Sequence, residues 1–396
     1  MAENLETKRI YIDAVSEYES AFRIRPDNYE IAVKIKDLYQ ELGQKSNYVK
    51  ACENAIQVDP SQKEMYLELM DCYLESNNFR EALKLADKAE KNIGVDNEIS
   101  ERIIMIKGQY GISTYSLNIV KGLYYIDNSN GYYIAEKDGQ YGLISAKNAI
   151  IADFEYDDIG LLSNDLIPVK KNAEYYYING DGYRKLVPDK TAEYLGTFGN
   201  GYAPAKYNGV YGYVNNRLKE FHFEYDYAGC FSNGIAAVEK DGKWGIINTD
   251  FEEVTGFEFD EIVMNAYDFC STYGVFFAKK GNQYYLYDKA GTELAGGFDD
   301  VEMFASDEPA AVRIGDKWGY ISKTGETFIE PKYEKAKSFC IGYGPFMKDG
   351  KWGCIDKAEN ILIEPVFEEM DSFTKNGVSS VVKDDIGSYI AVTIYD

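Results

Sequence analysis

The chain has 396 residues, of which 45% are hydrophobic and 27% are charged, so it holds enough apolar side chains for two ordinary domain cores. Its formal net charge of −24 argues against nucleic acid and an anionic membrane surface as partners, because both are bound through Lys and Arg. Basic proteins, metal cations and neutral glycans remain as candidates. No apolar run reaches the roughly 18 residues of a membrane-spanning helix.

Residues 1–96 carry the apolar period of helices and repeat about every 34 residues. Pro26 and Pro60, which are 34 residues apart, each close a similar phrase. Small and aromatic residues recur in register around them: Tyr11, Ala14, Tyr18 and Ala21, then Ile35, Tyr39, Cys52 and Ala55, then Tyr66, Leu69, Tyr73, Ala82, Ala86 and Ala89. This pattern resembles the tetratricopeptide repeat, whose two antiparallel helices interlock through small and aromatic side chains.

The first helical copy is incomplete. Its second helix is predicted at residues 11–24, and only Met1 to Arg9 precede it, too few residues for a full first helix. Half a repeat would expose an apolar face. We therefore expect a missing upstream segment, either more helix, a membrane anchor or another domain. The alternative is that the short leader covers this face.

Acidic residues occupy the helix positions that line the concave groove of tetratricopeptide repeats. These positions are Glu30, Asp37, Glu41, Glu64, Asp71 and Glu75. The register predicts no Lys or Arg between them, so the resemblance implies a groove that selects basic segments of a protein partner. The alternative is a solvated acidic face without a partner.

A short amphipathic stretch at residues 98–107 predicts a linking helix, and beyond it the apolar period changes from 3.6 to 2. We place a linker at residues 97–122 and an all-β region at residues 123–396. Trp-Gly or Tyr-Gly steps recur through this region, with aromatic residues at Tyr141, Tyr211, Trp244, Trp318 and Trp352. With degenerate copies at Tyr175, Tyr284 and Ile386, the spacings are 34, 36, 33, 40, 34, 34 and 34. Such regularity indicates seven or eight units that bury their cores against neighbours.

One unit illustrates the pattern. A strand at residues 235–240 leads to the hairpin turn Asp241-Gly242, and Trp244 opens the return strand. A third strand ends in the pair Phe259-Asp260. The phrase Asp-Gly-Lys-Trp-Gly, found at residues 241–245 and 349–353, resembles the WG-repeat (KWG-repeat) proteins of bacteria. The resemblance covers residues 123–396 and implies a bacterial protein, either cytoplasmic or the soluble portion of a membrane-anchored protein.

The expected fold is therefore α+β and multidomain: tetratricopeptide-type helices followed by an all-β WG-repeat array. We expect the array to close like a propeller, and an open β-solenoid is the alternative. The aromatic anchors are expected to pack between sheets, where a large ring contributes about 2 to 3 kcal/mol. The alternative role for these rings is stacking on a ligand. The glycine that follows each ring is expected to allow close approach of a neighbouring backbone.

A carboxylate follows the aromatic residue that ends each unit. The six are Asp157, Asp226, Asp260, Asp299, Glu334 and Glu368. We expect each to accept hydrogen bonds from its own turn or from the next unit. The alternatives are a surface for cations or basic peptides and a paired-carboxylate glycosidase site, for which no isolated acid pair can be chosen.

Residues for other chemistry are sparse. The six cysteines form no cluster, so buried thiols are expected, and the single histidine, His222, is expected at a surface or strand edge. A zinc site or a Ser-His-Asp relay therefore lacks its residues. The sequence predicts a non-catalytic scaffold that binds protein and needs no cofactor or metal. The alternatives are a glycan- or cell-wall-binding module that uses exposed tyrosines, and an enzyme with a carboxylate site in a central pocket.

Overall fold

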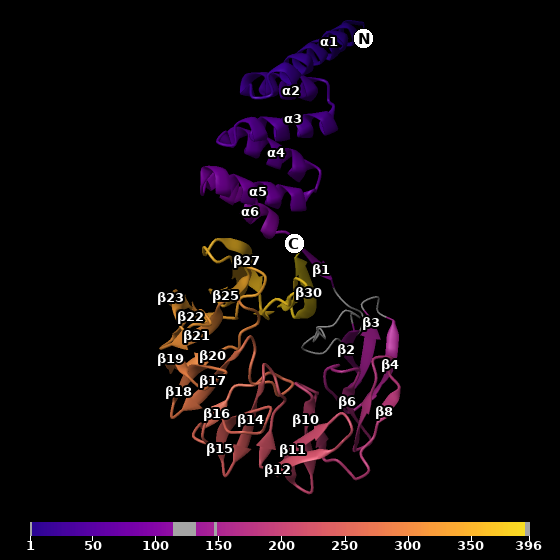
Figure 1. Cartoon of the computed structure of the whole chain (residues 1–396), viewed down its shortest axis with the longest axis vertical. Coiled ribbons are helices and arrows are strands. Elements are labelled where there is room, and N and C mark those ends of the chain that lie inside the picture. The colour runs from indigo at the N-terminus through magenta and orange to yellow at the C-terminus, as the bar shows by residue number, and fades with distance from the viewer. Residues whose placement is uncertain (1, 114–131, 146–148, 393–396) are drawn as a thin grey trace. The chain divides into compact units, whose positions relative to one another are not determined.

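The computed structural model describes residues 2–113, 132–145 and 149–392, which fall into two compact units. The first unit runs to Gln109 and is helical, and the second runs from Tyr110 to Val392 and consists of β-strands (Figure 1). The predicted α+β fold class is confirmed. Residue 123, the predicted start of the β region, lies outside the described residues.

The described part of the first unit contains six helices. They are α1 (Ala2–Ile24), α2 (Tyr29–Glu41), α3 (Lys45–Val58), α4 (Lys63–Glu75), α5 (Phe79–Ile93) and α6 (Asn97–Lys107). Asn28 caps α2 and Asp96 caps α6, because each side chain accepts backbone N–H groups of the first turn. The expected leader before residue 11 is part of the continuous helix α1. No helix in the described residues is both long and apolar enough to cross a membrane.

The helices pack in chain order, α2 on α3, α3 on α4 and α4 on α5. Their core contains the small and aromatic residues of the repeat register, among them Ala32, Cys52, Ala55, Tyr66, Leu69, Ala86 and Ala89. Lys36 is also buried in this unit, at 4% exposure. Its ammonium lies 2.6 Å from Glu68 and 2.9 Å from Asp37, and these carboxylates stabilise a charge that burial alone would disfavour.

The second unit is an array of eight antiparallel sheets within the described residues, and we call each sheet a blade. Blades 1 to 4 comprise, in order, β2 (Tyr132–Lys137), β3 (Gln140–Ser145) and β4 (Ile150–Tyr156); β5 (Asp158–Ile159), β6 (Ile167–Lys171), β7 (Glu174–Ile178) and β8 (Arg184–Leu186); β9 (Tyr194–Leu195), β10 (Tyr202–Tyr207), β11 (Val210–Asn215) and β12 (Glu220–Tyr225); and β13 (Tyr227–Ala228), β14 (Ile235–Lys240) and β15 (Lys243–Asn248). The predicted strand at residues 235–240 is thus β14.

Blades 5 to 8 continue the same order. They comprise β16 (Glu261–Ile262), β17 (Val275–Lys280), β18 (Gln283–Asp288) and β19 (Glu293–Phe298); β20 (Asp300–Val301), β21 (Ala310–Ile314), β22 (Lys317–Ile321) and β23 (Thr327–Tyr333); β24 (Lys335–Ala336), β25 (Gly344–Lys348), β26 (Lys351–Ile355) and β27 (Ile361–Phe367); and β28 (Glu369–Met370), β29 (Val378–Lys383), β30 (Ile386–Val392) and β1 (Tyr110–Ser113). Strand β1 pairs with β30, with Tyr110 opposite Val392. The strand that begins the unit therefore completes its last blade, and the predicted propeller-like form is confirmed (Figure 1).

Each blade buries its apolar side chains against the next blade. Between blades 4 and 5, for example, Ile246 and Phe259 pack in one cluster with Phe276 and Tyr287. Similar clusters join other neighbouring blades. Stability therefore depends on neighbour contacts, as is typical of repeat arrays.

Candidate functional site

The periodic carboxylates lie beside the hairpin turns of their own blades. Four of them accept backbone N–H groups there: Asp226 from Asp241 at 2.7 Å, Asp260 from Gly281 at 2.7 Å, Asp299 from Gly315 at 2.7 Å, and Glu334 from Asp349 at 2.8 Å and from Gly350 at 3.0 Å. The two backbone donors lower the pKa of Glu334 below its usual range. This geometry supports a turn-holding role for these carboxylates.

The lysine of the Lys-Trp-Gly phrase reaches the carboxylate of the following blade. Lys243 lies 2.5 Å from Asp260, and Lys351 lies 2.5 Å from Glu368. The side chain of Asp157 accepts no such bond within the described residues. Most of the periodic carboxylates are already bonded to lysine side chains or to backbone N–H groups. These carboxylates therefore do not form a ring of unpaired negative charges.

The aromatic anchors lie on the second long strand of each hairpin. Trp318 and Trp352 are buried, whereas Tyr141, Tyr211 and Trp244 are half-buried. In blade 8 the pairing of β29 with β30 sets Gly387 opposite Val382, just as Trp352 stands opposite Met347 in blade 7. The aromatic position of blade 8 is therefore Gly387, and its prediction at Ile386 was wrong by one residue.

The glycines that follow Trp318 and Trp352 are required because the outer strand crosses directly over these positions. A β-carbon at Gly319 would lie 2.5 Å from the carbonyl oxygen of Ile329, and one at Gly353 would lie 2.4 Å from that of Ile363. Both distances are shorter than a van der Waals contact. The local register shifts between β22 and β23 and between β26 and β27 fall at these glycines.

A second aromatic residue stands between the anchors of neighbouring blades in part of the array. Tyr194, at the start of blade 3, lies with its ring centroid 5.9 Å from that of Tyr175 and 5.8 Å from that of Tyr211. Tyr227, at the start of blade 4, lies 4.9 Å from Tyr211 and 5.5 Å from Trp244. The rings thus form a continuous row from blade 2 to blade 4.

A loop inserted in blade 5 completes this aromatic region. Residues 263–274 join β16 to β17 and account for the 40-residue spacing between Trp244 and Tyr284. The Tyr194 hydroxyl donates to Asp268 of this loop at 2.5 Å, and burial together with Asp268 raises the pKa of Tyr227. The loop therefore closes the space beside both intercalated tyrosines.

The equivalent space between blades 6 and 7 is open, because the residue there is Lys335. Its ammonium has no hydrogen-bond or ion-pair partner among the described residues. A cavity of about 520 Å³ lies here, lined by Asp300, Glu302, Arg313, Asp316, Trp318, Glu334, Lys335, Ala336, Lys337 and Trp352. Between blades 2 and 3, where Tyr194 and the inserted loop lie, the cavity measures only about 120 Å³.

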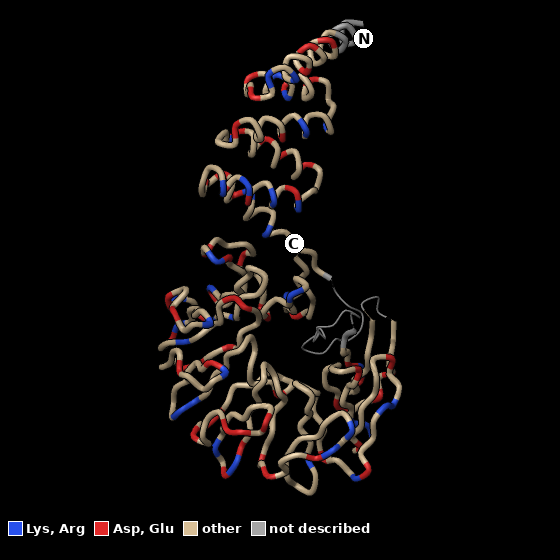
Figure 2. The backbone as a smooth tube through the Cα atoms, viewed as in Figure 1, with Lys and Arg blue, Asp and Glu red and all other residues tan. Residues whose placement is uncertain are grey.

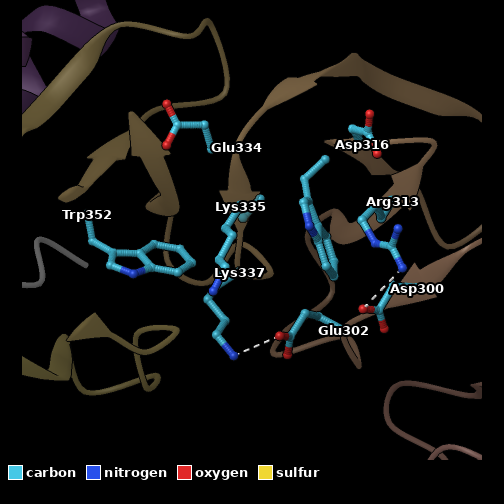
Figure 3. A pocket seen from close by; sticks show the side chains of 10 residues that line it. Asp300, Glu302, Arg313, Asp316, Glu334, Lys335, Lys337 and Trp352 are labelled. Atoms are coloured by element: carbon cyan, nitrogen blue, oxygen red, sulfur yellow. Dashed lines mark hydrogen bonds and ion pairs between the residues drawn. The ribbon is translucent and has the colours of Figure 1, made fainter. Parts of the chain in front are cut away.

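Paired charges line this cavity, which we call the Trp318–Trp352 pocket. The Lys337 ammonium donates to Glu302 at 2.7 Å, and Arg313 lies 3.7 Å from Asp300 (Figure 3). Burial raises the pKa of Glu302, and Lys337 opposes that shift by stabilising the carboxylate. Figure 3 shows Lys335 and Lys337 between Trp352 on one side and Asp300 and Arg313 on the other.

The predicted groove acids are mostly exposed in the helical unit. Acidic residues are spread through both units of the described chain (Figure 2). Arg102 donates to both carboxylate oxygens of Asp71 at 2.7 Å. Lys36 pairs with Asp37, and Lys45 lies 3.8 Å from Glu75. The expectation that no Lys or Arg lies between these acids is therefore wrong. Among the described residues, the unpaired members of the set are Glu30, Glu41 and Glu64.

The residues weighed for metal or nucleophile chemistry lie apart. All six cysteines are free and buried, and burial raises the pKa of the Cys354 and Cys230 thiols. His222 is exposed on β12 and stacks on Phe251 at 4.6 Å. Among the described residues, no group of three or more His, Cys, Asp and Glu side chains has the arrangement of a metal site.

The family model described as "WG containing repeat" matches residues 141–175, 221–244, 244–284, 318–352 and 352–385. These segments are similar to WG containing repeats. Each match begins or ends at or near the aromatic position of a blade, so the repeat unit spans the second half of one blade and the first half of the next. No match is found among the curated proteins.

Several solved structures resemble the chain at low sequence identity. Hsv2 of Kluyveromyces lactis is 8% identical, with a TM-score of 0.38 over 66% of this chain and 94% of that one. The WD40 domain of Neurospora crassa Pan2 is 8% identical, with a TM-score of 0.35 over 72% and 95%. The tetratricopeptide domain of Aspergillus fumigatus Sgt2 is 21% identical, with a TM-score of 0.20 over 26% and 70%.

Glu302, Lys335 and Lys337 were not among the predicted site residues. A signal for them was nevertheless present in the sequence. By strand register, this position holds Tyr194 in blade 3, Tyr227 in blade 4 and Lys335 in blade 7. In blades 2, 5, 6 and 8 it holds an acid: Asp158, Glu261, Asp300 and Glu369. Among the described blades, blade 7 alone has a lysine at this position.

Proposed function

We propose that this chain is a non-catalytic scaffold that binds protein partners through the WG-repeat array and the acidic helical groove. The observation that carries the proposal is the Trp318–Trp352 pocket, whose volume falls within the roughly 300 to 1,000 Å³ of ligand sites. Three of its four acids, Asp300, Glu302 and Glu334, are held by cations or backbone N–H groups. A pocket whose acids already have hydrogen-bond or ion-pair partners, and which lies beside aromatic rings, is suited to binding a ligand rather than to proton transfer.

One observation favours an enzyme as the second candidate. The raised pKa of Glu302 in a pocket is a feature of catalytic acids. The ion pair with Lys337 explains the presence of the Glu302 carboxylate without a catalytic role. We therefore expect no turnover of glycosides, esters, peptides or phosphoesters. Turnover that Glu302→Gln abolishes would replace the scaffold proposal with the enzyme.

The glycan alternative has less support. A sugar-binding face needs exposed ring surfaces, whereas Trp318 and Trp352 are 9% and 6% exposed. Tyr211 is covered by Tyr194 on one side and Tyr227 on the other. The aromatic anchors are therefore occupied mainly by packing within the array.

Capture of partners with the full chain tests the proposal. Substituting Glu30, Glu41 and Glu64 by Gln is expected to weaken capture of basic partners and to lower the association rate more than it raises the dissociation rate. Because exposed charges are screened within about 8 Å at physiological salt, capture should also fall between roughly 50 and 300 mM salt.

A matched control removes the same charge elsewhere in the helical unit. Asp87→Asn with Glu90→Gln and Glu101→Gln changes three exposed acids outside the groove set and is expected to leave capture unchanged. Equal losses with both triple variants would show a general charge effect and contradict the groove. Failure of the full chain to capture any protein at low salt would contradict the scaffold proposal itself.

A further inference from the structure

We propose that the Trp318–Trp352 pocket binds a tyrosine side chain of the partner protein, an inference that rests on the scaffold function proposed above. The array itself shows which group suits this space. In blades 3 and 4 the same position is filled by Tyr194 and Tyr227, each between the anchors of two neighbouring blades. In blade 7 the chain supplies Lys335 instead, and the space is a cavity.

In the two blades that precede blade 7, the charged residue at this position has a partner. In blade 5 Glu261 accepts the Tyr284 hydroxyl at 3.1 Å, and in blade 6 Asp300 lies 3.7 Å from Arg313. Lys335 is exposed, and its ammonium makes no such contact within the described chain. A lysine side chain without a partner is free to move into solvent, so an incoming ring displaces no hydrogen bond.

The pocket also provides a match for the tyrosine hydroxyl. In the filled positions Asp268 accepts the hydroxyl of Tyr194 and bonds to that of Tyr227. The pocket holds the carboxylate of Glu302, whose side chain is 34% exposed and bonded to Lys337. A site built to bond a hydroxyl discriminates strongly against a ligand without one, because its polar group is left without that bond. The pocket should therefore prefer tyrosine to phenylalanine.

The residues at the position of Gly229 explain why no loop of the chain closes this pocket as the inserted loop, residues 263–274, closes the space beside Tyr194 and Tyr227. Gly229 lies next to the inserted loop, where a β-carbon would meet the Asp268 carbonyl oxygen at 2.7 Å. At the corresponding position of blades 6 and 7 stand Glu302 and Lys337, whose side chains line the cavity, as Asp268 of the loop lines the cavity between blades 2 and 3. Between blades 6 and 7 the ion pair of Lys337 and Glu302 therefore stands where the loop lies in the other blades. An aromatic group that fills this pocket has to come from another molecule.

The test uses the full chain and blocked amino acids as probes. N-acetyl-tyrosinamide, N-acetyl-phenylalaninamide, N-acetyl-leucinamide and N-acetylglucosamine are each titrated into the protein, and their binding is compared by saturation-transfer NMR. Tryptophan fluorescence gives a second readout, since two of the three tryptophans line the pocket. We expect the tyrosine probe to bind most tightly. Lys335→Tyr places in blade 7 the tyrosine that blades 3 and 4 have at this position. It should weaken binding of the tyrosine probe at least tenfold without lowering the melting temperature.

Two further variants keep the test decisive. Lys348→Tyr adds the same ring to blade 7 at an exposed residue that does not line the cavity, and should leave binding unchanged. Glu302→Gln should reduce the preference for the tyrosine probe over the phenylalanine probe. The inference is overturned by equal binding to the wild-type chain and Lys335→Tyr, by equal binding of the leucine probe, or by binding of the sugar alone. Partner capture that survives Lys335→Tyr would overturn it while leaving the scaffold function in place.

Discussion

Replacing Trp318 with alanine is expected to lower the free energy of unfolding of the WG-repeat array by about 3 to 5 kcal/mol. The ring is 9% exposed and packs in one cluster with Ala336, Phe339 and Phe346 of the next blade. Its removal therefore takes apolar contacts from two blades at once and leaves a cavity between them. Because each blade depends on its neighbours, the loss should appear in the unfolding of the whole array.

Denaturant unfolding measures this loss, and Tyr183→Ala is the matched control. The side chain of Tyr183 is 72% exposed, so its removal should change the free energy of unfolding by no more than about 0.5 kcal/mol. A loss below about 1 kcal/mol for Trp318→Ala would show that the ring is not part of the core. It would also make ligand stacking the better interpretation of the anchors.

Adding a single methyl group at Gly353 is expected to destabilise the array by about 1 to 3 kcal/mol or more. The β-carbon of Gly353→Ala would lie 2.4 Å from the Ile363 oxygen, 2.7 Å from the Pro365 nitrogen and 2.9 Å from the Glu364 carbonyl carbon. All three are backbone atoms of β27, which cannot move without breaking its pairing with β26. The glycine of the Trp-Gly step is thus required by contact with the outer strand.

Gly387→Ala supplies the control for this substitution. Gly387 lies on β30 of blade 8, and a β-carbon there meets no atom within 4 Å. We expect its melting temperature to differ little from that of the wild-type chain. If Gly353→Ala proved as mild as Gly387→Ala, the outer strand would have room to shift, and the steric account of the repeat would be wrong.

The fold could be predicted because its determinants are local and repeated. Turn pairs such as Asp241-Gly242 specify hairpins, and the regular spacing of the anchors specifies blades. The pairing of the first strand of the array with its last strand was not predictable in this way. Strand β1 pairs with β30, almost 280 residues away in the sequence, and no turn or period connects the two.

The candidate site was harder to predict than the fold. The periodic carboxylates were identifiable from their spacing, but their partners are backbone N–H groups that the sequence does not display. The groove acids were chosen by register alone, and Arg102 reaches Asp71 from a helix outside the predicted repeats. Lys335 could have been found from the repeat spacing, because it follows the periodic carboxylate Glu334 as Tyr227 follows Asp226.

Site-specific photocrosslinking at the pocket rim tests the central claim most directly. A benzophenone side chain is introduced at Asp316, an exposed residue of the pocket, and separately at Asn282, which holds the same hairpin position in blade 5. In native lysate we predict a protein adduct at residue 316 that is absent at residue 282 and is lost with excess N-acetyl-tyrosinamide. Equal adducts at both residues, or none at residue 316, would contradict partner binding at this pocket.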